Sequence, residues 1–133
     1  MELKSNEKIE DLECNGLKII QSNNGFKFGT DAVILADFAK KHVDNKNVLD
    51  IGTGTGIISI LLAGKTNVKK IVGVDIQKDV CDMAQRSVEL NKLENKIEII
   101  NIDIKDIDKI IEKHTIDIIV TNPPYQKEST GKT

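Results

Sequence analysis

The chain has 133 residues, enough for one ordinary domain and too few for two. Its formal net charge is −2, so uniform electrostatic attraction to nucleic acid is not indicated, and 39% hydrophobic residues suit a globular fold. The polar start MELKSNEKIE lacks the apolar core of a signal peptide, and no apolar run approaches the ~20 residues of a membrane span. Cys14 and Cys81 lack the spacing of metal ligands. We therefore expect reduced thiols and a cytoplasmic protein.

The first 45 residues are predicted to form a β-hairpin and a helix that extend the main domain. Residues 1–8 are polar and are expected to be a loose tail. LKIIQS (17–22) is followed by the turn signal Asn-Asn-Gly (23–25) and by FKF (26–28), so we expect a small hairpin there. The helix is predicted over 30–42, with Thr30 as its cap.

Beyond residue 45, strand and helix patterns alternate. The predicted order is strand 47–51, helix 57–64 closed by Gly64, strand 68–76, helix 78–92, strand 96–101, helix 105–113 with Ile107, Ile110 and Ile111 facing inward, and strand 115–121. Four apolar strands separated by helices predict right-handed βαβ units and a parallel sheet. We therefore expect a Rossmann-like α/β core over residues 46–126, followed by a mobile tail, 127–133.

The first candidate site is a glycine turn in VLDIGTGTGIIS, between a strand and a helix. Gly52, Gly54 and Gly56 would let the backbone turn tightly and approach a ligand closely. Their spacing, G-x-G-x-G, differs from the dinucleotide fingerprint G-x-G-x-x-G. Asp50 would disfavour a pyrophosphate and favour a cation. S-adenosylmethionine carries a sulfonium and an ammonium and no phosphate, so it is the predicted cofactor; a tight turn without a ligand is the alternative.

Acidic residues also follow the next two strands. Asp75 ends the second strand and could accept hydrogen bonds from both ribose hydroxyls, while Ile76 could pack on the adenine face. Asp103 follows the third strand and could accept from the adenine amino group. Each acid alone could be a solvated strand end. Three acids at successive strand ends beside a glycine turn favour one ligand site.

The second candidate site follows the fourth strand, in DIIVTNPPYQ (117–126). The strand is expected beside the first, so Asn122 would emerge next to the glycine turn. A planar amino group is a poor nucleophile because its lone pair is delocalised. The Asn122 side-chain oxygen could accept one of its two hydrogens. The Pro123 carbonyl, held in place by the rigid backbone of Pro123 and Pro124, could accept the other. Tyr125 would supply a face for stacking. Such catalysis needs positioning and electrostatics and no metal; a simple strand end is the alternative.

VLDIGTGTG, GVDI and NPPY together resemble the Rossmann-like, class I S-adenosylmethionine-dependent methyltransferases that modify amino nitrogens. FKFGTDAVILADFA followed by VLDIGTGTGIISILLA is similar to the bacterial tRNA1(Val) adenine-37 N6-methyltransferase family, in which a Lys/Arg-x-Gly-Thr-Asp segment packs near the cofactor. The cofactor-binding residues expected from motifs and resemblance are Lys27, Gly29, Thr30, Asp50, Gly52, Thr53, Gly54, Gly56, Asp75, Ile76, Asp103, Ile104 and Asn122; the expected catalytic residues are Asn122, Pro123, Pro124 and Tyr125.

The resemblance implies methyl transfer to an exocyclic amino nitrogen, with adenine N6 in tRNA as the expected target. The alternatives are glutamine N5-methylation of release factors, methylation of an rRNA or DNA amino group, a cofactor-binding piece without activity, and an NAD-type domain. The resemblance also implies a seven-stranded sheet with three strands after NPPY, whereas the chain ends at Thr133. We therefore expect the fourth strand to be an exposed edge, and the piece to be marginally stable as a monomer or to self-associate.

Overall fold

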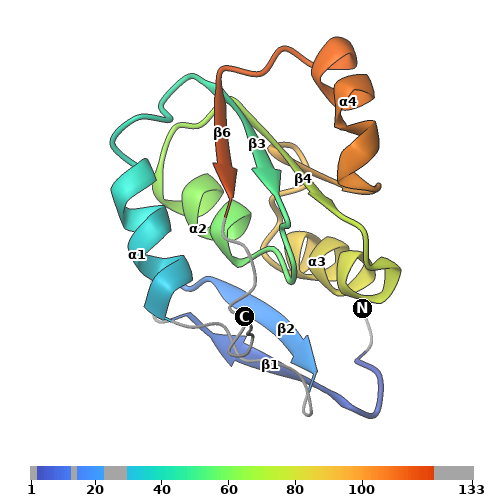
Figure 1. The fold of residues 1–133 in the computed structure, drawn as a ribbon. Coiled ribbons are helices and arrows are strands. Elements are labelled where there is room, and N and C mark those ends of the chain that lie inside the picture. Colours follow the sequence, from blue (N-terminus) through green and yellow to red (C-terminus); the bar gives the residue numbers. More distant parts are fainter. Residues whose placement is uncertain (1–2, 13–14, 23–29, 122–133) are drawn as a thin grey trace, which may run out of the picture.

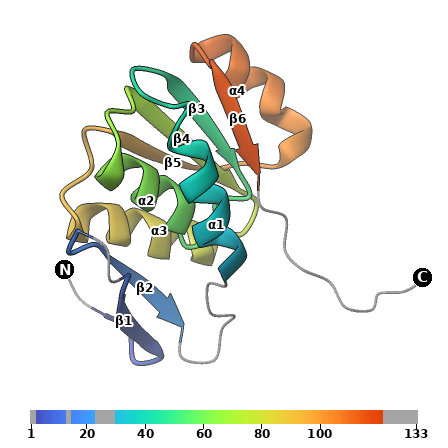
Figure 2. The same cartoon turned by 90° about the vertical axis from the view of Figure 1, so that its left-hand side faces the viewer.

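The computed structural model describes residues 3–12, 15–22 and 30–121. Its core is a four-stranded parallel sheet in the order β5-β4-β3-β6, with helices on both faces (Figures 1 and 2). The elements are β1 (Glu7–Asp11), β2 (Lys18–Ser22), α1 (Thr30–Ala39), β3 (Asn47–Ile51), α2 (Ile57–Lys65), β4 (Lys70–Asp75), α3 (Lys78–Leu90), β5 (Ile97–Asn101), the 3₁₀ turn η1 (Ile104–Asp106), α4 (Ile107–Lys113) and β6 (Ile118–Thr121). The parallel sheet and the pairing of the first predicted strand with the fourth are confirmed.

The strands are apolar on both sides because both faces of the sheet are packed against helices. Val48 and Ile71 face a core that they share with α1, α2 and α3. Leu49 and Val72 face the opposite side, where Ile110 of α4 packs. The sheet is therefore the middle layer of the molecule, and its strand ends are the places where polar residues gather.

The α4 side of the sheet is the less covered one. Ile119 of β6 is 53% exposed, and β6 lies at the end of the sheet order among the described strands, as expected for an edge strand. Ile111 was predicted to face inward and does not: it is exposed, while Ile110 is buried. Successive helix residues differ by about 100° around the axis, so a helix as short as α4 buries only a narrow stripe.

The N-terminal hairpin differs from its prediction. β2 matches the predicted strand 17–22, but its partner is β1, paired antiparallel with Ile9 opposite Ile20. The expected loose tail thus contains the start of a strand at Glu7, and the expected partner, 26–28, lies outside the described residues. The sequence EKIED hides this strand because it has one apolar residue and no visible alternation.

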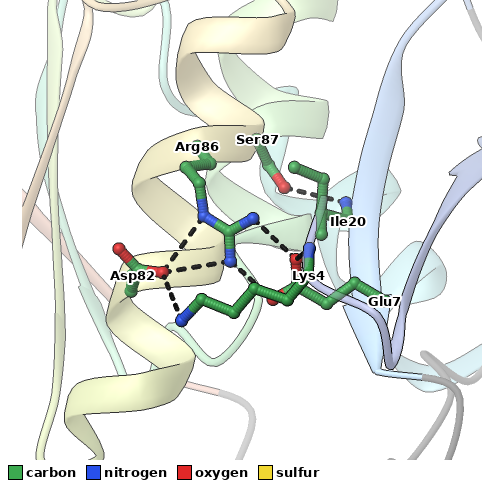
Figure 3. Close-up of polar contacts among 6 residues, drawn as sticks. All are labelled: Lys4, Glu7, Ile20, Asp82, Arg86 and Ser87. Carbon is green, nitrogen blue, oxygen red and sulfur yellow. Dashed lines mark hydrogen bonds and ion pairs between the residues drawn. The ribbon is translucent and has the colours of Figure 1, made fainter. Parts of the chain in front are cut away.

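A seam of hydrogen bonds holds the hairpin to α3 (Figure 3). The Arg86 guanidinium donates to both carboxylate oxygens of Glu7, at 2.7 and 2.5 Å. Ser87 Oγ accepts from the Ile20 amide at 2.8 Å, and the Asn91 side chain both accepts from and donates to the main chain of Lys18, at 2.9 and 2.6 Å. Side chains of α3 thus hydrogen bond the outer edge of β2 in place of a third strand. We call this group the hairpin seam.

Gly64 was predicted to terminate the second helix, but α2 continues through it to Lys65. A Cβ at Gly64 would lie 2.6 Å from Leu17 Cδ1, so this glycine lets the hairpin approach the helix. The first helix is shorter than predicted, because α1 ends at Ala39 instead of residue 42. The difference at Gly64 depends on its contact with Leu17, which a local pattern does not contain.

Candidate functional site

The carboxyl ends of β3, β4 and β5 meet at one edge of the parallel sheet, which is where ligands bind in open α/β sheets. The strand order places the turn after β3 between the ends of β4 and β6. Three of the predicted site residues, Asp50, Asp75 and Asp103, therefore come from three neighbouring strand ends, as the sequence predicted.

The glycine turn joins β3 to α2 in a conformation that side chains rarely adopt. Gly52, Gly54 and Gly56 have φ values of 72°, 56° and 88°. The amides of Gly52 and Thr53 both donate to the Val74 carbonyl at 2.9 Å, which ties the turn to the end of β4. The turn therefore needs glycine at these positions, whether or not a ligand is bound.

Asp50 lies beneath this turn and is only 1% exposed. Its Oδ2 accepts hydrogen bonds from Thr53 Oγ1 at 2.9 Å and from Ser59 Oγ at 2.7 Å, whereas its buried Oδ1 has no hydrogen-bond partner. Desolvation raises the pKa of the Asp50 carboxyl to about 6, against the opposing effect of the two hydroxyl donors. Because the Thr53 hydroxyl is turned toward Asp50, any ligand contact by Thr53 would come from its main chain.

Two residues of this site were missed by the sequence analysis. Ser59 is fully buried in the apolar helix α2 and donates to Asp50. Gly73 lies opposite Asp50 in β4, and a Cβ there would lie 2.8 Å from Thr53 Oγ1. A polar residue in an apolar helix and a glycine inside an apolar strand are the signals that could have identified them.

Asp75 connects the glycine turn to the start of α3. Its Oδ2 accepts from the Gly54 amide and its Oδ1 from the Gln77 amide, both at 2.9 Å. Each carboxylate oxygen keeps a second lone pair, so the half-buried group can still accept two hydroxyl donors. Ile76 follows it and is 62% exposed, so an apolar side chain stands open at this edge.

The end of β5 is held against the end of β4. The Asn101 side chain donates to the carbonyls of Asp75 and Ile76, at 3.0 Å each. Asp103 is half-buried, and its Oδ1 accepts from the Lys105 amide at 3.1 Å, which caps η1. Ile104 is exposed beside it. The structure thus brings Asp103 to the predicted edge and gives one of its oxygens a capping role.

Several predicted site residues lie outside the described residues, namely Lys27, Gly29, Asn122, Pro123, Pro124 and Tyr125, and for Thr30 only its place as the first residue of α1 is described. The last described residue of β6 is Thr121, whose Oγ1 donates to the Ile51 carbonyl at 3.2 Å. The described part of β6 therefore ends beside the end of β3, and the NPPY motif follows it in the sequence.

The model of the methyltransferase small domain family matches residues 12–133. The chain belongs to this family. Among proteins similar to it are the tRNA1(Val) (adenine(37)-N6)-methyltransferases of Phocaeicola vulgatus and Haemophilus influenzae, which are 39% and 35% identical over 77% and 80% of this chain. The chain spans less than half of each relative, 42% and 46% respectively.

Solved structures agree on the fold of this family member. An S-adenosylmethionine-dependent methyltransferase from Agrobacterium tumefaciens superposes with a TM-score of 0.71 at 23% identity, over 92% of this chain and 41% of that one. The aTrm5 chain of a complex with tRNALeu superposes with a TM-score of 0.63 at 28% identity, over 76% of this chain and 29% of that one. The Rossmann-like methyltransferase fold predicted from the sequence is confirmed.

Three observations indicate that the residues at this edge of the sheet suit S-adenosylmethionine. Asp50 leaves a buried acceptor oxygen without a partner, Asp75 has free lone pairs at the edge, and Ile76 exposes an apolar side chain beside it. In residues 3–12, 15–22 and 30–121, no three His, Cys, Asp or Glu side chains are grouped so that they could hold a metal ion. None of the helices in these ranges has the length and apolar character needed to cross a bilayer.

Proposed function

We propose that this chain forms the cofactor-binding part of an S-adenosylmethionine-dependent methyltransferase that acts on the N6 amino group of an adenine in tRNA. One observation carries the proposal: a left-handed glycine turn and the acids Asp50, Asp75 and Asp103 share one edge of a parallel sheet. The names of the relatives support adenine in tRNA as the target over glutamine in a protein. A cytoplasmic location stays a prediction of the sequence.

The bound cofactor would supply an electrophilic methyl group on its sulfonium. The protein would hold the cofactor along the edge of the sheet, with its adenine, ribose and amino-acid parts at successive strand ends. Asp103 after β5 would accept from the adenine amino group, Asp75 after β4 would accept from the ribose hydroxyls, and the turn after β3 would face the amino-acid end. In the order β5-β4-β3-β6, the next position belongs to the segment that follows β6.

That segment is NPPY, and its chemistry suits an amino group. The Asn122 side-chain oxygen and the Pro123 carbonyl would accept the two hydrogens of the target nitrogen, so that its lone pair is no longer delocalised into the ring. Tyr125 would stack on the base. These groups would raise the rate by positioning and by hydrogen bonds that strengthen in the transition state.

The test combines binding and turnover with the whole chain. Titration calorimetry should detect S-adenosylhomocysteine and no NAD, and Asp75→Ala should weaken S-adenosylhomocysteine by removing charge-assisted acceptors worth roughly 1.5–3 kcal/mol each. Asn122→Ala should lower methylation of tRNA by roughly 10²–10³, a far larger effect than its effect on S-adenosylhomocysteine affinity. Binding of NAD would refute the cofactor, and methylation of a release factor in place of tRNA would refute the substrate.

A further inference from the structure

One buried side chain outside the predicted site is unsatisfied. Gln21 of β2 is 1% exposed, and neither its Nε2 nor its Oε1 has a hydrogen-bond partner. Burying an amide without partners costs free energy that an apolar side chain of similar size would not cost. Native proteins leave few such groups, so each one calls for a physical reason.

Strand geometry gives the direction in which Gln21 points. Alternate residues of a strand face the same side, so Gln21 shares a face with Ile19 and Leu17. Leu17 lies against Gly64 of α2, and Ile19 belongs to the core between the sheet and α1, α2 and α3. Gln21 therefore faces the interior on the side of α2, in continuation of the row that begins with Leu17 at the C-terminal end of that helix.

The hairpin seam gives the level that Gln21 reaches. The Lys18 amide donates to the Asn91 side chain. The Ile20 amide donates to Ser87 Oγ (Figure 3). Two strand residues span about 6.6 Å and four helix residues about 6 Å, so β2 and α3 run antiparallel and stay in step. One residue further along, Gln21 comes level with the turn of α3 that contains Ala84.

Ala84 in turn contacts the glycine turn. A Cβ built on Gly56 would lie 3.3 Å from the Ala84 Cβ, so the two backbones are close. Gly56 is the residue before α2, a helix of nine residues. The unpartnered amide of Gln21 thus comes to the level of the last glycine of the turn and of the N-terminus of α2, where the main-chain amides and the helix dipole favour a negative charge.

We infer that Gln21 binds the amino-acid end of the cofactor: Nε2 donates to the carboxylate, and Oε1 accepts from the ammonium. An amide has both a donor and an acceptor, which matches a zwitterion, and the amino-acid end is the part assigned to the turn after β3. The inference rests on the proposed function, and adds a binding residue from β2, an element outside the sheet. It also gives the unpaired Gln21 amide a hydrogen-bond partner.

The test separates the two ends of the ligand. S-adenosylhomocysteine and 5′-deoxy-5′-methylthioadenosine share the nucleoside and the thioether, but the second lacks the amino-acid end. Gln21→Met keeps the length of the side chain and removes its polar atoms. We expect calorimetry to show roughly ten- to a hundredfold weaker binding of S-adenosylhomocysteine, as for a hydrogen bond to a charged group, and unchanged binding of methylthioadenosine.

The same variant should unfold at the same or a higher temperature than the wild type without ligand, because an unpaired amide has been removed. Ile19→Met, on the same face, is the matched control and should bind both ligands like the wild type. Equal weakening of both ligands, unchanged binding of S-adenosylhomocysteine, or a lower melting temperature of Gln21→Met would each overturn the inference. A wild-type chain that binds neither ligand would instead refute the proposed function, and the inference with it.

Discussion

Asp50 and its two donors, Thr53 and Ser59, form the floor of the glycine turn. This floor and the hairpin seam are both polar and mostly buried, but they differ in how their polar atoms are hydrogen bonded. In the seam, Glu7, Ser87 and Asn91 all hydrogen bond within the chain. Asp50, beneath the turn, has one oxygen without a hydrogen-bond partner, and the buried side-chain amide of Gln21 in β2 has no partner for either polar atom. Buried polar groups that build a fold are normally satisfied by it. The unpaired groups of Asp50 and Gln21 therefore support the proposed ligand site.

The two regions also shift carboxyl pKa values in opposite directions. The hydrogen bonds from Arg86 lower the pKa of Glu7 to about 2, whereas desolvation raises the pKa of Asp50 to about 6. Glu7 therefore stabilises the fold above its ordinary pKa, and that contribution is lost as the pH falls from about 4.5 to about 2. Asp50 acts in the opposite sense: stability falls as the pH rises from about 3.8 to about 6 and stays lower above that.

The largest effect should come from breaking the seam. Arg86→Ala leaves the Glu7 carboxylate, whose side chain is 4% exposed, without its bidentate partner. We expect the free energy of unfolding at pH 7 to fall by roughly 2–3 kcal/mol, as measured by urea denaturation. Asp82→Ala removes the exposed acceptor of the same guanidinium and should cost about 1 kcal/mol or less. A loss for Arg86→Ala no greater than for this control would show that the seam is not a stabilising contact.

The floor of the turn should respond in the opposite direction. A rise of the carboxyl pKa from 3.8 to about 6 lowers the free energy of unfolding by roughly 3 kcal/mol at neutral pH. An Asn side chain would avoid this cost, but its own unpaired amide would offset part of the gain. Asp50→Asn should therefore raise the free energy of unfolding by roughly 1–2 kcal/mol at pH 7 and remove the decline between pH 4 and 6. The half-buried Asp103 is the control site, and Asp103→Asn should leave that decline in place. A less stable Asp50→Asn protein would contradict the conclusion that the ionised Asp50 carboxylate destabilises the fold by its burial.

Local pattern was enough for much of the fold and for part of the site. The apolar run 47–51 and the glycines after it predicted β3 and its turn, because both depend on neighbours in the chain. The positions of the acids also followed, since carboxyl ends of parallel strands share an edge. These predictions needed only the period of the apolar residues and the order of the elements.

Several of the residues and elements that were missed have partners far away in the sequence. β1 is fixed by Arg86, 79 residues from Glu7, and nothing in EKIED indicates that contact. Gly64 and Gly73 look like a helix end and a weak strand position until Leu17 and Thr53 are placed against them. Polar satisfaction can be judged only in three dimensions, so Gln21 was indistinguishable from an ordinary strand residue.

The smallest predicted effect is also the most direct test of the contrast between seam and floor, because it compares one substitution at two fully buried helix serines. Ser87→Ala removes the acceptor of the Ile20 amide, a neutral group whose loss of a partner costs the same at every pH. Ser59→Ala removes a donor to the Asp50 carboxylate, and that donor is worth most when the carboxyl is ionised.

Urea denaturation at pH 5 and at pH 8, below and above the Asp50 pKa of about 6, should separate the two serines. Ser87→Ala should cost about 1 kcal/mol at both pH values. Ser59→Ala should cost about 1 kcal/mol at pH 8 and clearly less at pH 5, because a protonated Asp50 needs less hydrogen-bond donation than a charged one. Equal costs at the two pH values for Ser59→Ala would mean that Asp50 does not change its charge between them. The unpaired Oδ1 would then belong to a carboxyl of constant charge. The contrast between hydrogen-bonded polar groups in the seam and unpaired ones elsewhere would then depend on Gln21 alone.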